Sequence, residues 1–352
     1  MEIYILDRDV QILGVVTVYD AIVWKSKLNE PGTFKASFLF SEEMNCLLKR
    51  GRLLYKTDEE EPAVITRKYL KLDKTGAETI QVQGYMASRY LNQRIIWSRM
   101  ILKGTSEEIM RRMVEEQVIH PADEKRAMNR IRLGELCGCE DEVEKQVAYD
   151  NLQEALSDVA KAAELGYRLR LDVKERLFFF EVYQGMDRTL GTKEPCIFSR
   201  DFRNVYTQEY SEDDSNRRNI CLVGGAGEEE ERVLTTVGDG EGLDRYELFY
   251  GASGISSSDL AVEEYRSQLS QKGGERLAKC VAARSFESKV NQTEAMTFSL
   301  GDRVTCVDQR WDVRMDAQIT GIEKGFSKTE KSLTVTFGNA VPTLIDLIKN
   351  MK

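Results

Sequence analysis

Histidine is nearly absent from this sequence, since His120 is the only one among 352 residues. A site with several histidine metal ligands is therefore excluded. Long apolar runs are also missing, and no stretch approaches the ~18 consecutive apolar residues of a membrane span, so membrane insertion is not expected. Basic residues are outnumbered, and the net charge of −9 with a pI near 5.1 disfavours tight DNA binding, which needs a basic surface.

Motifs of catalysis are missing as well. The sequence has no Gly-x-Ser-x-Gly elbow, no His-Glu-x-x-His helix and no arrangement of cysteine with histidine for a nucleophile. A pair of carboxylates, as in a glycosidase, stays open because acidic residues are abundant. Asp302 and Asp308 flank one expected strand, but we interpret both as turn acceptors. No catalytic, cofactor-binding or metal-ligating residue is predicted.

The seven cysteines are scattered and odd in number, and most lie in apolar, strand-like runs. This pattern predicts reduced thiols in the core. A single residue separates Cys137 from Cys139, which is a poor spacing for a metal site. The sequence begins with MEIYIL and lacks the basic head and long apolar stretch of a signal peptide, so we expect a protein made and kept in a cytoplasm.

What the sequence does contain is an ordinary soluble composition, with 41% hydrophobic and 31% charged residues. Its length exceeds the size at which a single core keeps growing, so two to four domains are expected. The first 83 residues show strand patterns, with a four-residue turn at Asn29-Glu30-Pro31-Gly32 between two of them. A short helix capped by Ser41 is expected at residues 42–49.

The middle of the chain changes to a mixed pattern. Thr105 and Glu108 form a capping box that opens a helix to about residue 119, where His120 has a surface role. A second helix is expected at 151–165, with Gly166 as its left-handed C′ residue, followed by a hairpin at 167–183. The three phenylalanines 178–180 alternate between the faces of that hairpin, which predicts core packing and not a platform for stacking bases.

Strand patterns return towards the end of the chain. They are expected at 196–198, 205–210 and 219–223, and again at 303–307, 316–322 and 333–337, the last three forming an antiparallel meander. Between the two sets, GGAGEEEERV superficially resembles a phosphate-binding loop, but it lacks the Gly-Lys-Ser/Thr ending and carries four successive glutamates. We interpret it as a solvated loop.

Four stretches of this chain resemble those of one family. They are W-K-x-K-x-N-E-P-G-x-F-x-A-x-F at 24–38, YLNQRIIW at 90–97, GLDRYE at 242–247, and the final LGDRVT…ITGIEKGFSKT…LTVTFG. In this order they resemble the tail-associated baseplate hub, or tail tip, proteins of long-tailed bacteriophages, including prophage-encoded ones. The match reaches nearly the whole chain.

The resemblance, together with the order of strands and helices, implies a β-rich α+β fold. We expect two small antiparallel β-barrels separated by a mixed α/β domain, with an insertion in the second barrel. The predicted boundaries are 1–95 for the first barrel, 96–194 for the mixed domain, 195–223 with 294–341 for the second barrel, 224–293 for the insertion, and 342–352 for a closing helix.

The resemblance also implies a structural function. Three chains would form a ring that joins the sixfold tail tube to the threefold tip around the DNA exit path. The expected partners are the protein itself as a homotrimer, the tail tube or distal tail protein, the tape-measure protein, and tip or receptor-binding proteins, with DNA only in passage. The expected location is the virion tail, after assembly in the host bacterial cytoplasm. Two alternatives stay open, a tail-borne peptidoglycan hydrolase and the hub of a non-viral contractile injection system.

Overall fold

The computed structural model describes residues 2–227, 232–252, 262–278, 280, 283–290, 297–328 and 330–338. The chain divides into two compact units. The large unit comprises Met1–Glu209 and Phe286–Gly338, and the small unit contains Tyr210–Ser285. The prediction of a β-rich α+β fold is confirmed.

The N-terminal part of the large unit is an antiparallel sheet over a core of alternating apolar residues. Phe34, Ala36 and Phe38 are buried on one face, as their alternation predicts. Ser41 accepts a hydrogen bond from the backbone N–H of Met44 and so caps the predicted helix. The elements are β1 (Ile3–Leu6), β2 (Ile12–Val16), β3 (Ala21–Lys27), β4 (Thr33–Leu39), α1 (Glu42–Leu47), β5 (Leu53–Tyr55), β6 (Ala63–Leu72) and β7 (Glu78–Met86).

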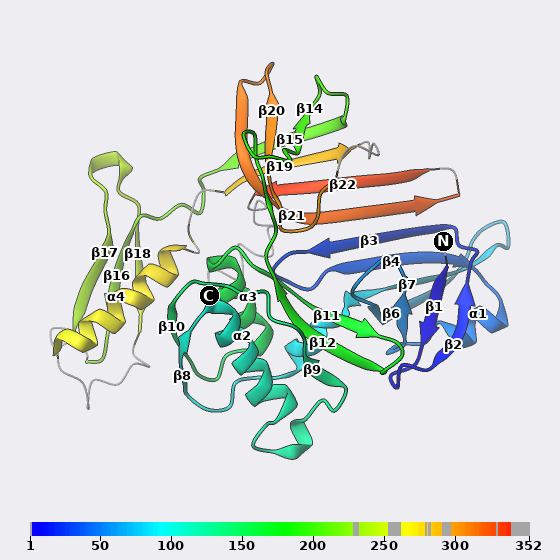
Figure 1. The fold of residues 1–352 in the computed structure, drawn as a ribbon, viewed down its shortest axis with the longest axis horizontal. Helices are drawn as coiled ribbons and strands as arrows, with labels where there is room; N and C mark the ends of the chain where they lie inside the picture. The colour runs from blue at the N-terminus through cyan, green and yellow to red at the C-terminus, as the bar shows by residue number, and fades with distance from the viewer. Residues whose placement is uncertain are drawn as a thin grey trace. The chain divides into compact units, whose positions relative to one another are not determined.

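The middle part combines two helices with short sheets (Figure 1). The capping box of Thr105 and Glu108 is present. Phe178 and Phe180 are buried, which confirms their place in the core. The elements are η1 (Ala87–Gln93), β8 (Met100–Gly104), α2 (Ser106–Val114), η2 (Glu115–Ile119), η3 (Glu124–Arg126), β9 (Ile131–Leu133), β10 (Val143–Val147), α3 (Leu152–Ala162), β11 (Gly166–Asp172) and β12 (Leu177–Tyr183).

The end of α3 differs from the prediction. The residue with left-handed backbone is Glu164, whose φ is 54°, and Gly166 is already the first residue of β11. A glycine at 166 is needed for another reason, because a Cβ there would lie 2.3 Å from the ring of Tyr183. A glycine just after a helix can be required by a left-handed backbone or by the close approach of a side chain, and the sequence pattern does not distinguish these two causes.

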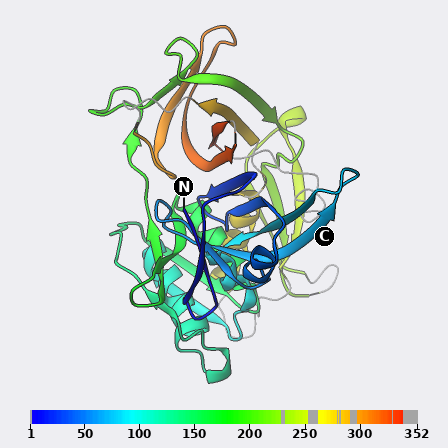
Figure 2. The same ribbon diagram turned by 90° about the vertical axis from the view of Figure 1, so that its right-hand side faces the viewer.

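The C-terminal part of the large unit contains the predicted meander. Strands β20, β21 and β22 pair antiparallel in sequence order. Their ribbons curve strongly in Figure 2. The rings of Phe198, on β14, and Phe337, on β22, lie 4.7 Å apart. The elements are β13 (Asp187–Arg188), β14 (Ile197–Ser199), β15 (Val205–Asp213), β19 (Ala283–Val290), β20 (Arg303–Asp308), β21 (Val313–Ser327) and β22 (Lys331–Gly338).

One strand from the N-terminal part of the chain, β3, pairs with one from the C-terminal part, β21. β21 pairs antiparallel with β3 over seven residue pairs, from Gly321 opposite Lys27 to Ser327 opposite Ala21. This seam joins the N-terminal and C-terminal strands into one 14-stranded sheet. Among the described strands, the pairing order does not close into a barrel, so the two-barrel arrangement and its domain boundaries stay a prediction.

The small unit is a three-stranded sheet with one helix. Its elements are β16 (Ile220–Gly224), β17 (Leu234–Gly238), η5 (Gly242–Asp244), β18 (Glu247–Gly251) and α4 (Val262–Ala278). β16 lies between β17 and β18, whereas the sequence predicted that residues 219–223 belong to the second barrel. A short apolar run of this kind suits a strand in either sheet, so the pattern identifies a strand without identifying its neighbours.

Two predicted segments lie outside the described residues. These are the four glutamates 228–231 of the glycine-rich loop and the closing helix at 342–352. In the part of the chain that is described, no helix has the length and apolar character needed to cross a membrane.

Candidate functional site

The turn before β20 brings two chain segments into backbone contact. Gly301 has a φ of 96°, a conformation that favours glycine. Gly185 lies against it so closely that a Cβ on Gly185 would be 2.0 Å from the Gly301 carbonyl carbon. The N–H of Gly301 donates to the carbonyl of Ile319 at 2.9 Å. Both glycines are therefore required by the close approach of the two backbones.

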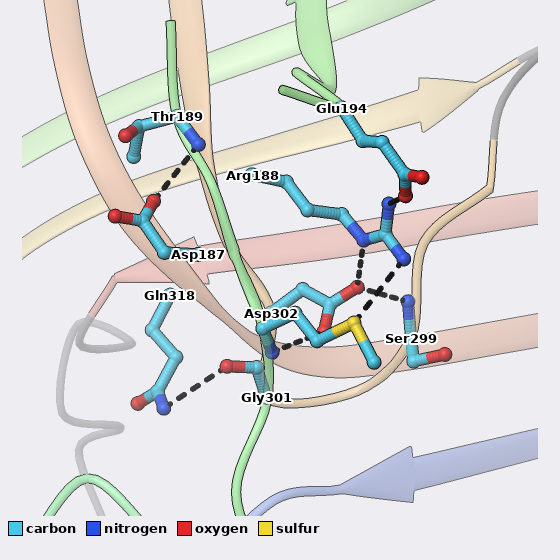
Figure 3. Close-up of polar contacts among 9 residues, drawn as sticks. Asp187, Arg188, Thr189, Glu194, Ser299, Gly301, Asp302 and Gln318 are labelled. Atoms are coloured by element: carbon cyan, nitrogen blue, oxygen red, sulfur yellow. Dashed lines mark hydrogen bonds and ion pairs between the residues drawn. The ribbon is translucent and has the colours of Figure 1, made fainter. Parts of the chain in front are cut away.

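Asp302 is the centre of this contact, which we call the Asp302 junction. Its carboxylate is 2% exposed and accepts three hydrogen bonds, from the N–H of Met186 at 2.8 Å, the N–H of Ser299 at 2.9 Å and Nε of Arg188 at 3.0 Å. Figure 3 shows Arg188 reaching from β13 onto this carboxylate, while its Nη1 contacts Glu194 and its Nη2 contacts the sulfur of Met186. The junction thus connects β13 to the start of β20.

Asp308 repeats the arrangement at the other end of β20. Arg200 donates to its carboxylate through Nε at 2.8 Å and through Nη2, and the backbone N–H groups of Arg310 and Trp311 add bonds at 2.9 and 3.0 Å. Burial alone would raise the pKa of Asp308, but the hydrogen bonds from Arg200 and from the two N–H groups outweigh it and hold the pKa below its ordinary value of 3.8.

These two aspartates do not form a catalytic pair. Six residues of extended chain separate Asp302 from Asp308, which is about 20 Å at ~3.3 Å per residue. Glycosidase carboxylates stand roughly 5–9.5 Å apart. Each carboxylate is also occupied by an arginine and by backbone donors. The sequence predicted that Asp302 and Asp308 accept hydrogen bonds in turns, and this geometry agrees with that prediction.

The seam between β3 and β21 is supported by a buried lysine. The Lys56 side chain is fully buried, and its ammonium lies 5.4 Å from the ring centroid of Trp24 and 4.8 Å from that of Phe326. Its Nζ is 3.3 Å from Oε1 of Glu59. The same oxygen accepts from Nζ of Lys324 at 2.8 Å. Glu59 therefore links the turn that follows β5 to β21.

A second carboxyl group, Glu61, is enclosed where the N-terminal strands meet β11. Its Oε1 accepts from the backbone N–H of Ser88 and from that of Leu169 at 3.3 Å. Burial raises the pKa of Glu61 to about 7, although the hydrogen bonds from Ser88 and Leu169 and the charge of Arg168 lower it. Glu61 is therefore partly protonated near neutral pH.

The remaining polar candidates are ordinary surface residues or thiols. His120 is exposed at the end of η2. Four cysteines are buried as predicted, but Cys46 and Cys137 are exposed and Cys139 is intermediate. Within the described ranges, the one group of three or more side chains able to share a metal ion is Glu107, Cys137 and Cys139. The sequence did not predict this group.

The sequence also did not predict the buried charges that organise the junctions. Arg188 lies 114 positions from Asp302, and Arg200 lies 108 positions from Asp308. Lys56 and Glu61 occur in the polar stretch KTDEEE, which predicts a solvated turn. The alternation of strands carries no information about such distant partners, and no other signal in a single sequence indicates them.

Comparison with known proteins gives one family and a consistent fold. The model of the family described as Siphovirus ReqiPepy6 Gp37-like protein matches residues 2–339. No curated protein sequence matches the chain.

Several solved structures share the fold. The 43 kDa tail protein of prophage MuSo2 from Shewanella oneidensis is 12% identical with a TM-score of 0.63, covering 96% of this chain and 98% of that one. A tail protein from Neisseria meningitidis MC58 is also 12% identical, with a TM-score of 0.57 and coverage of 96% of both chains. Prophage tail protein gp18 from Listeria monocytogenes EGD-e is 11% identical with a TM-score of 0.53, covering 100% and 98%.

Proposed function

We propose, because the chain belongs to the Siphovirus ReqiPepy6 Gp37-like protein family, that this protein is the structural baseplate hub of a phage or prophage tail. The observation that carries the proposal is the family match over residues 2–339, which leaves almost none of the chain outside it. The three tail proteins with the same fold, two of them from prophages, are each covered over nearly their whole length, which supports the same assignment.

The arrangement of the sheet suits a scaffold. The β3–β21 seam joins strands from the N-terminal and C-terminal parts of the chain into one sheet. The ion pair between Lys56 and Glu59 lies next to this seam. The buried carboxylates at 302 and 308 are occupied by arginines that connect strands. The charged groups described at these positions therefore hold strands together, which is what a load-carrying ring component requires.

Three such chains form the ring in our proposal. Each chain contributes its N-terminal and C-terminal strand regions, so that a trimer presents six similar regions to a sixfold tail tube. The ring binds the tube or distal tail protein on one side and the tape-measure, tip or receptor-binding proteins elsewhere. The net charge of −9 suits a wall past which DNA slides without sticking. The protein assembles in the host cytoplasm and is carried in the virion tail.

Mass and location test this proposal together. Light scattering of the purified protein should give about 120 kDa, three times the chain mass of 40.2 kDa, or a monomer that trimerises when its tail partners are added. A reconstruction of tail particles should show threefold density for this chain at the distal end of the tube. A stable dimer, or tails complete at the tip without this chain, would contradict the proposal.

A further inference from the structure

The loop that follows β9 is bonded back to the first turn of α2. Asp141 accepts from the backbone N–H of Ser106 at 3.2 Å and also from its hydroxyl. Arg111, one turn further along the helix, donates through Nη2 to the carbonyl of Gly134 at 2.9 Å. Both ends of the loop 134–141 are therefore anchored to one helix. Such anchoring holds the residues between them in a defined position.

Glu107 anchors the middle of the same loop from beneath. It is 2% exposed, and its Oε1 accepts from the N–H of Cys137 at 2.9 Å while its Oε2 accepts from the N–H of Gly138 at 3.0 Å. Gly138 has a φ of 84°, which lets the chain turn tightly between the two cysteines. A buried carboxylate thus lies directly under a Cys-Gly-Cys turn.

The turn brings two thiols together above this carboxylate. Sγ of Cys137 and Sγ of Cys139 are 3.2 Å apart, and Sγ of Cys137 lies 3.3 Å from Oε2 of Glu107. The ligand atoms of all three side chains lie within 4.8 Å of one another. Cys137 is exposed, so the group opens to solvent on one side.

We propose that Glu107, Cys137 and Cys139 bind a thiophilic divalent cation, with Zn²⁺ as the natural candidate. The two thiolates and one carboxylate oxygen supply three ligands, and water from the open side supplies the fourth. Two sulfur ligands select Zn²⁺ or a similar soft ion over Mg²⁺ or Ca²⁺, which prefer oxygen alone. Because this site stands on its own geometry, it does not depend on the hub function.

The present distances are close to those of a filled site. In a tetrahedron with Zn–S near 2.3 Å and Zn–O near 2.0 Å, two sulfurs stand about 3.8 Å apart, and a sulfur and an oxygen about 3.5 Å apart. The observed sulfur–sulfur distance of 3.2 Å needs to widen by about 0.6 Å, and the sulfur–oxygen distance of 3.3 Å by about 0.2 Å. Cys137 and Cys139 each lose a thiol proton on binding, and the Cys137 proton now lies towards Oε2 of Glu107.

The charges around the site favour a cation. Glu135, Glu140 and Glu142 lie in or beside the same loop, and Arg111 lies on the far side of the carboxylate, with Nη1 3.9 Å from Oε1 of Glu107. That oxygen faces the arginine and the N–H of Cys137, whereas Oε2 faces the thiols. Both oxygens accept a backbone N–H of the loop, and Oε2, which also faces the Cys137 thiol, is the one placed to be a ligand.

Cobalt titration tests the site directly. Co²⁺ added to the reduced, metal-free full-length protein should bind at one ion per chain and produce thiolate-to-cobalt charge-transfer absorption, which Zn²⁺ then abolishes. Cys137→Ser and Cys139→Ser should each weaken binding at least tenfold, and Glu107→Gln should weaken it less. Cys46→Ser removes an exposed thiol elsewhere in the large unit and should bind as the wild type does. Circular dichroism checks that each variant is folded.

A thermal-shift measurement keeps the test valid if a serine variant fails to fold. Zn²⁺ should raise the melting temperature of the wild-type protein, and Mg²⁺ at the same concentration should not. Absence of the charge-transfer absorption, its persistence in Cys137→Ser, or equal stabilisation by Mg²⁺ would each overturn the proposal. Isolation of the protein with Cys137 and Cys139 joined in a disulfide that withstands cellular reductants would also overturn it.

Discussion

Asp302 and Glu61 are both enclosed carboxyl groups in the large unit, but their charges are compensated in different ways. Asp302 has an arginine at 3.0 Å in addition to two backbone donors. Glu61 has two backbone donors and, among the described residues, no bonded arginine, and burial raises its pKa to about 7. Arg188 supplies Asp302 with an opposite charge, whereas burial among uncharged donors favours the protonated form of Glu61. Substitutions of Asp302 and of Glu61 should therefore change the stability of the protein in different ways.

The largest effect is expected from Asp302→Ala. The change removes the buried carboxylate next to Arg188, whose side chain is 13% exposed and keeps its ion pair with the exposed Glu194, and it takes this acceptor away from two backbone N–H groups. Loss of one partner of a buried charged pair costs about 3–5 kcal/mol. Chemical denaturation should show this as a large fall in the midpoint, while Asp201→Ala at an exposed position should change it little. Equal midpoints for both variants would show that the junction is not structural.

Glu61→Gln should produce a pH-dependent effect. Because the folded pKa of about 7 lies above the ordinary 4.5, the contribution of the protonated form is fully present below about 4.5 and is lost as the pH rises through 7. The difference between 4.5 and about 7 corresponds to about 3 kcal/mol across that window. Unfolding free energies measured from pH 4.5 to 8 should decline for the wild type relative to Glu61→Gln. Parallel curves for the two proteins would contradict the protonation of Glu61.

Asp308→Asn should show the opposite dependence on pH. The folded pKa of Asp308 is depressed, so its contribution is present above the ordinary value of 3.8 and is lost as the pH falls through the folded pKa. Arg200 is 37% exposed, and screening limits the expected loss to about 1–2 kcal/mol at neutral pH. Denaturation at pH 7 and pH 3 measures it. A wild-type advantage that persists unchanged at pH 3 would contradict the pairing.

The smallest expected difference, about 1 kcal/mol between two glycine substitutions, concerns the turn itself. Gly301→Ala places a Cβ in a left-handed conformation, 3.1 Å from Cδ1 of Leu28 and 3.3 Å from N of Gly185. Gly76→Ala is the matched control, since its φ of 83° is similar but nothing lies within 4 Å of the added Cβ. Both should lose about 1 kcal/mol from the backbone conformation, and Gly301→Ala about 1 kcal/mol more from crowding. Equal melting temperatures for Gly301→Ala and Gly76→Ala would show that crowding of the added Cβ at position 301 does not lower stability.

Local patterns predicted the elements well. The meander of β20, β21 and β22, the caps of α1 and α2, and the burial of Phe178 and Phe180 all follow from alternation, spacing and capping residues. Each depends on neighbours within a few positions, or on a hairpin partner just along the chain. The left-handed residue at the end of α3 was assigned wrongly because two different constraints select glycine there.

Residue spacing determined where most strands and helices form, the order of these elements together with the family resemblance indicated the β-rich α+β class, and composition excluded a multi-histidine centre. Only the tertiary structure decided that β3 pairs with β21, that Arg188 and Arg200 compensate buried aspartates, and that Glu107 lies beneath Cys137 and Cys139. The physical reason is range. Periodicity records which face of an element is buried, whereas pairing of strands and of charges depends on segments from about 30 to 300 positions away, whose approach is set by packing of the whole sheet.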